Sequence, residues 1–127
     1  MTPTLHPGDL LWFRKTRTFQ RGQIALVRQD ETELKIKRIV GLPSESVSIR
    51  AGNVSINEQP FSEPYVPPTA HFQPQSDCSW MLGPGQFIVL GDARDDSLDS
   101  RRLGPVHLDQ IVGIAGFRLW PLPFRLR

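Results

Sequence analysis

The stretch Val47-Ser48-Ile49-Arg50-Ala51-Gly52-Asn53-Val54-Ser55-Ile56 (residues 47–56) alternates apolar and polar side chains on both sides of a small dipeptide. A period of two places the apolar side chains of each arm on one face of a β-strand. The intervening Ala51-Gly52 includes a residue that tolerates the positive φ of a tight hairpin turn. We therefore predict a β-hairpin, and this hairpin indicates the class of the fold.

Short runs of β-branched and aromatic residues continue in both directions from the hairpin, with glycine and proline between them. Such punctuated runs are typical of strands. The expected strands are Leu10–Phe13, Ile24–Arg28, Leu34–Val40, Val47–Arg50, Asn53–Ile56, Phe87–Leu90 and Ile111–Leu119. Helix is scarce, with a single turn expected over His107–Gln110. The sequence thus predicts a mainly β fold, and its 127 residues suit one domain over residues 1–127.

Residues 57–85 interrupt this pattern with half of the chain's 12 prolines. Proline lacks the N–H group that a regular β-ladder needs. We expect a long proline-rich surface excursion here, which its aromatic residues hold against the sheet. These residues are Phe61, Tyr65, Phe72 and Trp80.

The formal net charge of +2 is unevenly distributed, because five cations share a stretch without any acidic residue. They are Arg14, Lys15, Arg17, Arg21 and Arg28. Such a patch suits nucleic acid or an anionic lipid surface, and equally a solvated loop and strand edge. No recognition helix, aromatic RNA-binding signature or zinc spacing accompanies it, so no nucleic-acid partner is expected.

Cys78 is the only cysteine, which rules out an internal disulfide. The three histidines are scattered, and no carboxylate or cysteine stands near any of them at the spacing of metal ligands, so we expect no metal and no other cofactor. No apolar run approaches the roughly 18 residues of a spanning helix. The chain as given is therefore not expected to cross a membrane.

Three segments carry the chemistry. They are Gly91-Asp92-Ala93-Arg94-Asp95-Asp96-Ser97-Leu98-Asp99-Ser100-Arg101, Lys37-Arg38-Ile39-Val40-Gly41-Leu42-Pro43 and Pro3-Thr4-Leu5. Together they resemble the type I signal peptidases, serine endopeptidases that use a Ser-Lys dyad to remove signal peptides from exported proteins. The resemblance covers nearly the whole chain. It implies a signal-peptidase-like complex of antiparallel sheets.

The resemblance also implies roles for individual residues. Lys37 matches the general base, and Ser97 matches the serine that orients the lysine amine by a hydrogen bond. Asp99 and Arg101 match a pair that braces the loop, and Arg38 is expected to join them through charge-assisted hydrogen bonds. Lys37 accepts a proton near neutral pH only if burial or a neighbouring cation lowers its pKa. A solvated strand lysine is the alternative interpretation.

In the family motif Ser-Met-x-Pro-Thr-Leu the nucleophilic serine directly precedes the methionine, which here is Met1. We therefore expect that the chain as given contains no nucleophile, lacks the upstream segment and membrane anchor, and is inactive alone. Two alternatives remain open. One is a catalytically silent relative that binds peptides, and the other is a soluble Ser-Lys maturation protease with one dedicated substrate.

The same resemblance implies a peptide-binding surface. Met1 and Leu5 would line the pocket for a small substrate side chain, while Lys35 and Ile36 would offer a strand edge to an extended signal peptide. Ordinary core packing is the alternative for Met1 and Leu5.

Two turn positions depart from the family pattern. Ser44 stands where the family has glycine after Leu-Pro, and Glu58 follows Asn57 where the family has Asn-Gly. A position that needs a positive φ penalises residues with a Cβ atom. We expect the consequence to be confined to local turn geometry.

The stretch from Phe117 to Arg127 combines Trp, Phe and Leu with three arginines and no acidic residue. This mixture suits a membrane interface, and we expect contact with the membrane surface through the Trp120 and Phe124 region. An edge strand that covers the core is the competing interpretation. In the full-length protein the resemblance implies a membrane-associated domain on the outer, extracytoplasmic side.

Overall fold

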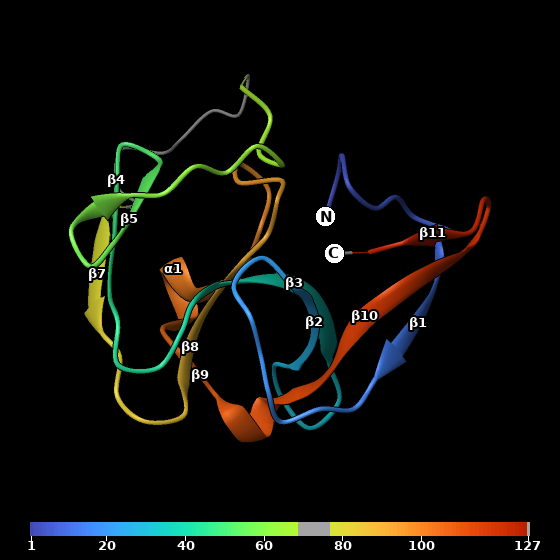
Figure 1. The fold of residues 1–127 in the computed structure, drawn as a ribbon, viewed down its shortest axis with the longest axis horizontal. Coiled ribbons are helices and arrows are strands. Elements are labelled where there is room, and N and C mark those ends of the chain that lie inside the picture. Colours follow the sequence, from blue (N-terminus) through green and yellow to red (C-terminus); the bar gives the residue numbers. More distant parts are fainter. Residues whose placement is uncertain (69–76, 127) are drawn as a thin grey trace.

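The computed structural model describes residues 1–68 and 77–126 of the chain. Two antiparallel sheets lie side by side (Figure 1), and Met1 packs against the same apolar cluster that contains Leu126. The larger sheet has the strand order β1–β10–β2–β3–β8–β9, with β11 paired to β10. The smaller sheet has the order β6–β5–β4–β7.

The larger sheet consists of β1 (Leu10–Arg14), β2 (Ile24–Arg28), β3 (Leu34–Gly41), β8 (Gln86–Leu90), β9 (Val106–His107), β10 (Ile111–Trp120) and β11 (Phe124–Arg125). The smaller sheet consists of β4 (Ser46–Arg50), β5 (Asn53–Ile56), β6 (Gln59–Pro60) and β7 (Cys78–Met81). One short helix, α1 (Ser100–Leu103), precedes β9, and a 3-10 helix over Leu108–Gln110 precedes β10. The prediction of a mainly β fold with antiparallel sheets and little helix is confirmed.

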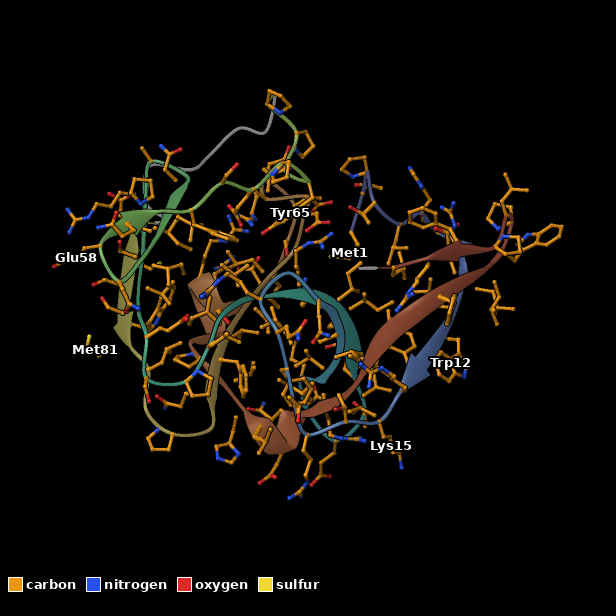
Figure 2. The ribbon with its side chains drawn as sticks, in the orientation of Figure 1. Met1, Trp12, Lys15, Glu58, Tyr65 and Met81 are labelled. Carbon is orange, nitrogen blue, oxygen red and sulfur yellow. The ribbon has the colours of Figure 1, made fainter. Side chains whose placement is uncertain are left out.

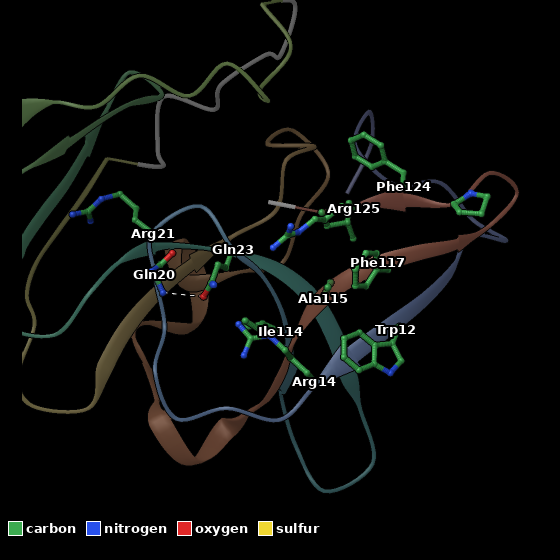
Figure 3. Close-up of a pocket in the computed structure, with 13 residues that line it drawn as sticks. Trp12, Arg14, Gln20, Arg21, Gln23, Ile114, Ala115, Phe117, Phe124 and Arg125 are labelled. Carbon is green, nitrogen blue, oxygen red and sulfur yellow. Dashed lines mark hydrogen bonds between the residues drawn. The ribbon is translucent and has the colours of Figure 1, made fainter.

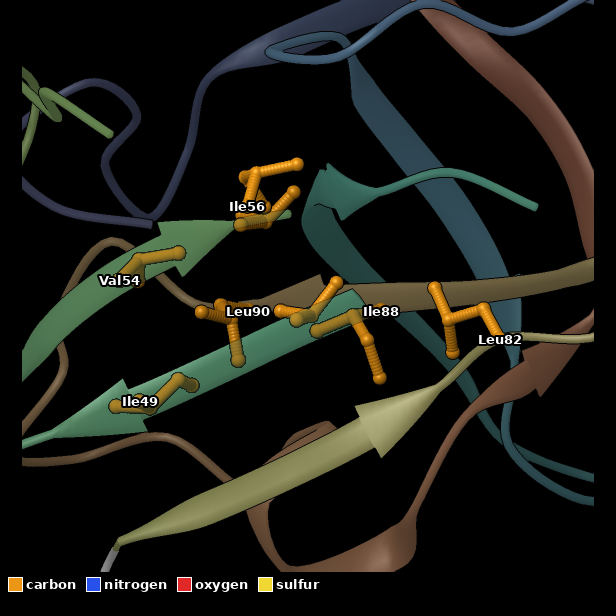
Figure 4. Packing of buried hydrophobic residues seen from close by; sticks show 8 residues of the cluster. Ile49, Val54, Ile56, Leu82, Ile88 and Leu90 are labelled. Carbon is orange, nitrogen blue, oxygen red and sulfur yellow. The ribbon is translucent and has the colours of Figure 1, made fainter. Parts of the chain in front are cut away.

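The hairpin predicted over residues 47–56 is the pair β4–β5, in which Ile49 lies opposite Val54. Its turn residues Ala51 and Gly52 have φ angles of 47° and 79°. Positive φ at both positions is what a two-residue type I′ turn requires. The inward side chains of this hairpin pack against β8, including Leu90, in an apolar cluster (Figure 4).

Strand β3 contributes to all three apolar clusters found among the described residues. Val40 packs with the smaller sheet, Ile39 packs with β2, β8 and β10, and Ile36 packs against the cluster formed near the chain ends. The strand is therefore held on both faces. This burial fixes the backbone on which the candidate catalytic lysine lies.

Both ends of the expected excursion join the smaller sheet, because β6 pairs with β5 and β7 pairs with β4. The expectation that residues 57–85 form no ladder is wrong at these ends. β6 and β7 are the outer strands of the sheet, and an outer strand tolerates Pro60 because one of its edges needs no partner. Phe61 and Trp80 pack against the cluster of the smaller sheet, whereas Phe72 lies outside the described residues.

No helix within residues 1–68 and 77–126 is long and apolar enough to cross a bilayer.

Candidate active site

Lys37 and Ser97 meet although they are far apart in sequence. Lys37 lies on β3, and its Nζ donates a hydrogen bond of 2.8 Å to Ser97 Oγ. Ser97 reaches this position because Gly91 has no side chain: a Cβ at Gly91 would lie 2.6 Å from Ser97 Cβ and 3.6 Å from Lys37 Nζ. The two polar groups are thus brought together at the end of β8.

The Lys37 side chain is partly withdrawn from water. It lines a cavity of about 210 Å³ together with apolar side chains that include Val27, Val89 and Leu98. Burial lowers the pKa of Lys37 below its ordinary value of 10.5.

Charged neighbours act on the pKa of Lys37 in both directions. The Asp99 and Asp96 carboxylates raise it, and the Lys35 and Arg101 cations lower it. Because burial has the largest effect, the net change is downward. A lowered pKa is what a lysine needs to act as a base near neutral pH.

Asp99 joins the end of β8 to α1. Its Oδ2 accepts a hydrogen bond of 3.0 Å from the Gly91 N–H, and its Oδ1 accepts bonds from the backbone N–H and Nε of Arg101. Burial alone would raise the pKa of Asp99, but the Arg101 guanidinium and the Gly91 N–H together lower it. The carboxylate therefore caps α1 as a charged group.

Arg38 pairs with Asp92 and does not join Asp99, so the expected group of Arg38, Asp99 and Arg101 is wrong. Its Nε and Nη2 donate to the two carboxylate oxygens of Asp92 at 2.8 and 2.6 Å. The reason is the alternation of a strand, which turns Arg38 to the opposite face of β3 from Lys37. Thr4 completes this second group, because its Oγ1 donates to Asp92 Oδ2 at 2.8 Å.

Three of the four expected substrate-binding residues lie together. Leu5 is buried in the cluster near the chain ends, and Met1 and Ile36 pack against it. Lys35 instead lines the cavity beside Lys37 and forms an ion pair of 2.6 Å with Glu33. The split again follows the alternation of β3.

One edge of β3 is open next to Lys37. Pairing with β8 begins at Arg38, which lies opposite Leu90. In the described parts of the chain, no strand pairs with residues 34–37 on this side. The backbone there is available to an added strand.

Three residues of this region were not predicted as members of the site. Arg94 binds Glu63 by two hydrogen bonds, and Tyr65 lies over the Arg38 guanidinium. Tyr65 is one of the aromatic residues expected to hold the excursion against the sheet, although its contact with Arg38 was not predicted. Arg94 stands in the Gly91–Arg101 run, which was the signal for that residue. No pattern in the sequence indicated the contact of Glu63.

Within residues 1–68 and 77–126, no three or more His, Cys, Asp or Glu side chains lie together in a way that suits a metal ion.

The chain matches the family model described as signal peptidase, peptidase S26, over residues 1–120. It therefore belongs to the signal peptidase family, and the resemblance drawn from its motifs is confirmed. It is similar to signal peptidase I of Leptolyngbya laminosa, with 36% identity over 117 residues that cover 91% of this chain. It is also similar to signal peptidase I of Bacillus licheniformis, with 32% identity over 139 residues that cover 95% of this chain and 72% of that protein.

A solved structure supports the same assignment. A crystal structure of a signal peptidase I from Enterococcus faecalis matches with a TM-score of 0.64 and 28% identity, covering 76% of this chain and 96% of that chain. In length the chain spans 53% of the Leptolyngbya relative and 60% of a probable signal peptidase I from Synechocystis.

Proposed function

We propose that this chain is the catalytic domain of a signal peptidase I, a serine endopeptidase that removes signal peptides from exported proteins. The observation that carries the proposal is the Lys37 amine, which is held by Ser97 at 2.8 Å among apolar side chains, beside an open strand edge. A buried lysine with a lowered pKa is a base for a serine hydroxyl.

In the proposed reaction, the nucleophile is a serine directly before Met1, as the family motif implies. Its oxygen attacks the scissile carbonyl carbon while Lys37 Nζ takes the hydroxyl proton, and the same nitrogen returns the proton to the leaving amine. Water then hydrolyses the acyl-enzyme. Ser97 orients the amine, and Asp99 with Arg101 holds the loop that carries Ser97.

The proposed substrate is an extended signal peptide that adds a strand to the open edge of β3. Backbone hydrogen bonds to an edge supply affinity, and pockets for alternate side chains supply selectivity. Met1, Leu5 and Ile36 line the apolar region beside this edge, which suits a small apolar side chain next to the cleaved bond.

The proposed second partner is the membrane surface. Trp120, Leu122 and Phe124 lie at the end of the β10–β11 hairpin with 63%, 71% and 57% of their surface exposed. Phe124 also lines a groove of about 1140 Å³ with Arg14, Arg125 and further aromatic rings (Figure 3). Exposed aromatic rings beside cations are typical of a surface that contacts lipid headgroups, which supports a membrane-associated location. The extracytoplasmic side is proposed from the family alone.

The test of the peptidase is cleavage of a synthetic signal peptide that has alanine at the cleavage site and two residues before it. The chain with a serine added directly before Met1 is expected to cleave this peptide, and Lys37→Ala is expected to abolish cleavage. Lys15→Ala is the matched control, because Lys15 is an exposed lysine outside the site. The chain without the added serine is expected to be inert.

The chain without the added serine could also cleave the peptide. If that cleavage persisted in its Lys37→Ala variant, the proposed role of Lys37 would be contradicted. Peptide binding without cleavage by the serine-extended chain would instead favour a catalytically silent peptide-binding relative.

A further inference from the structure

Residues 61–66, called the strap here, leave the smaller sheet and contact the larger one. Phe61 begins the strap with a hydrogen bond from its N–H to Val54 O at 2.9 Å. Glu63 then binds Arg94 with both carboxylate oxygens, and its Oε2 lies 2.8 Å from Arg94 Nη1. The side chains of Arg94 and Glu63 are only 1% and 8% exposed, so this is a buried ion pair.

Tyr65 makes the second contact between the strap and the larger sheet. Its ring centroid lies 3.9 Å from the Arg38 guanidinium carbon, and its hydroxyl donates to Glu63 Oε1 at 3.0 Å. Figure 2 shows Tyr65 between the smaller sheet and the start of the chain at Met1. A stacked guanidinium is oriented as well as attracted.

Each of the two arginines that the strap holds is linked to one partner of the Lys37–Ser97 contact. Arg38 follows Lys37 on β3 and binds Asp92. The Nε of Arg94 donates to Gly91 O at 2.8 Å, and Gly91 is the residue against which Ser97 packs. The strap therefore contacts both β3, which carries Lys37, and the loop after β8, which carries Ser97.

We propose that Glu63 and Tyr65 are positioning residues that fix the Lys37–Ser97 pair through Arg94 and Arg38. The importance of that pair rests on the proposed function, but the geometry does not. A buried ion pair adds little net stability compared with apolar packing of the same volume. The strap acts on the site by fixing the orientation of the two guanidinium groups. Arg94 donates directional hydrogen bonds to Glu63 and Gly91, and Arg38, under the Tyr65 ring, donates to Asp92.

The test uses NMR titration of the chain with isotope-labelled lysine. The lysines of the chain are Lys15, Lys35 and Lys37, so Lys15→Arg and Lys35→Arg suffice to assign the signals. Glu63→Gln and Tyr65→Leu are expected to raise the Lys37 pKa toward its ordinary value of 10.5, because a displaced Gly91 or β3 lets water reach the amine. Tyr65→Phe keeps the ring over Arg38 and is expected to stay close to wild type.

Matched controls come from a second aromatic and a second ion pair in the same region. Phe61 also lies near an arginine, at 5.5 Å from Arg21, and Glu45 binds Arg21 through both oxygens. Neither Phe61 nor Glu45 contacts Arg38 or Arg94 through a hydrogen bond or ring in the described chain. Phe61→Leu and Glu45→Gln are therefore expected to lower stability while leaving the Lys37 pKa at its wild-type value.

A further variant keeps the test valid if Glu63→Gln does not fold. Replacing both Glu63 and Arg94 by leucine leaves no unpaired buried charge, so we expect the fold to be retained and the Lys37 pKa still to rise. An unchanged Lys37 pKa in this double variant and in Tyr65→Leu would overturn the proposal. An ordinary Lys37 pKa in the wild-type chain would instead contradict the proposed catalytic function. The failure of the strap proposal can thus be distinguished from the failure of the proposed function.

Discussion

At the scale of the residue, the Lys37 amine makes the free energy of unfolding depend on pH. The folded chain holds this lysine with a pKa below the ordinary value of 10.5 that it regains on unfolding. Between the two values the unfolded chain binds more protons, so stability rises with pH in that interval. At pH values below the folded pKa, the amine is charged in both states, and burying this charge lowers the free energy of unfolding by its full amount.

Lys37→Met removes this cost, because methionine fills a similar volume without a charge. We expect the variant to gain stability relative to wild type at neutral pH. The gain should shrink as pH rises through the folded pKa and reach its minimum above 10.5, where the wild-type lysine is neutral in both states. Urea unfolding at a series of pH values checks this, and a difference that stays constant over the series would contradict a buried lysine.

Gly91 gives a second prediction at this scale. In Gly91→Ala the new methyl group would lie 2.6 Å from Ser97 Cβ, so Ser97 must move away from Lys37. We expect a loss of about 1–3 kcal/mol from overpacking. We also expect the Lys37 pKa to fall further, because the new methyl group would lie 3.6 Å from Nζ and the displaced Ser97 would no longer accept a hydrogen bond from the charged amine. Thermal unfolding and lysine NMR measure the two effects.

Gly83→Ala is the control for Gly91→Ala. A Cβ at Gly83 meets first the Oε1 atom of the flexible Gln86 side chain, at 3.3 Å. We therefore expect a smaller loss of stability and an unchanged Lys37 pKa. Equal effects of the two alanines would show that Gly91 has no special position beside Ser97.

The residues of the site differ in how far sequence alone predicts their partners. The alternation of β3 explains why Lys37 and Arg38 lie on opposite faces of the strand. The partner of Arg38 was not readable, because Asp92 and Asp99 both lie in the motif and only the three-dimensional path of the loop after β8 decides between them. The roles of Lys37 and Ser97 stay predictions, supported by the distance between them.

At the scale of the element, two turns contain residues poorly suited to their backbone. Ser44 has a φ of 68° and Glu58 has a φ of 67°. This left-handed region costs a residue with a Cβ about 1–2 kcal/mol. Glycine avoids that cost but loses about 0.5–1 kcal/mol more conformational entropy on folding.

The balance predicts that Ser44→Gly and Glu58→Gly each stabilise the chain by up to about 1 kcal/mol. Urea unfolding of the single variants checks this. Ser48→Gly is the control, because Ser48 lies in the extended strand β4, where glycine costs about 0.5–1 kcal/mol. Destabilisation by all three glycines would refute the argument from φ.

Long strands with clear alternation were predictable, and short strands were not. All seven expected strands are present with ends that differ by at most one residue. β6, β9 and β11 have only two residues each, which is too short for a period of two to appear. β7 was missed because the surrounding prolines favour a loop, and its pairing with β4 is a tertiary contact that the local sequence does not encode.

At the scale of the whole molecule, the two sheets are joined by charged side chains as well as by apolar packing. Arg21 and Glu45 bridge the loop before β2 and the turn before β4, and Arg94 and Glu63 bridge the β8 loop and the strap. Ion pairs of this kind fix orientation more than they add stability. None of the expected site residues lies on the smaller sheet. Through these ion pairs, the segments next to it help to fix the larger sheet and the loop that carry the site.

The opposite side of the molecule presents the hairpin end with Trp120 and Phe124, which we expect to bind membranes. Partition onto vesicles should increase when anionic lipid is added, because Arg125 and Arg14 line the adjoining groove and each cation near an anionic surface contributes about 1 kcal/mol. The increase should weaken at high salt as screening reduces it. Co-sedimentation with vesicles of neutral lipid, and of neutral lipid mixed with anionic lipid, measures both effects.

The double substitution of Trp120 and Phe124 by alanine should reduce the partition coefficient by roughly tenfold or more, since burying one aromatic ring contributes about 1.5–3 kcal/mol. Met81→Ala is the control, because Met81 is 79% exposed but lies on β7 of the smaller sheet, away from the hairpin (Figure 2). If Met81→Ala weakened binding as much as the double substitution, vesicle binding would reflect general surface hydrophobicity. Selective loss in the double variant would identify the hairpin as the part of the domain that faces the bilayer.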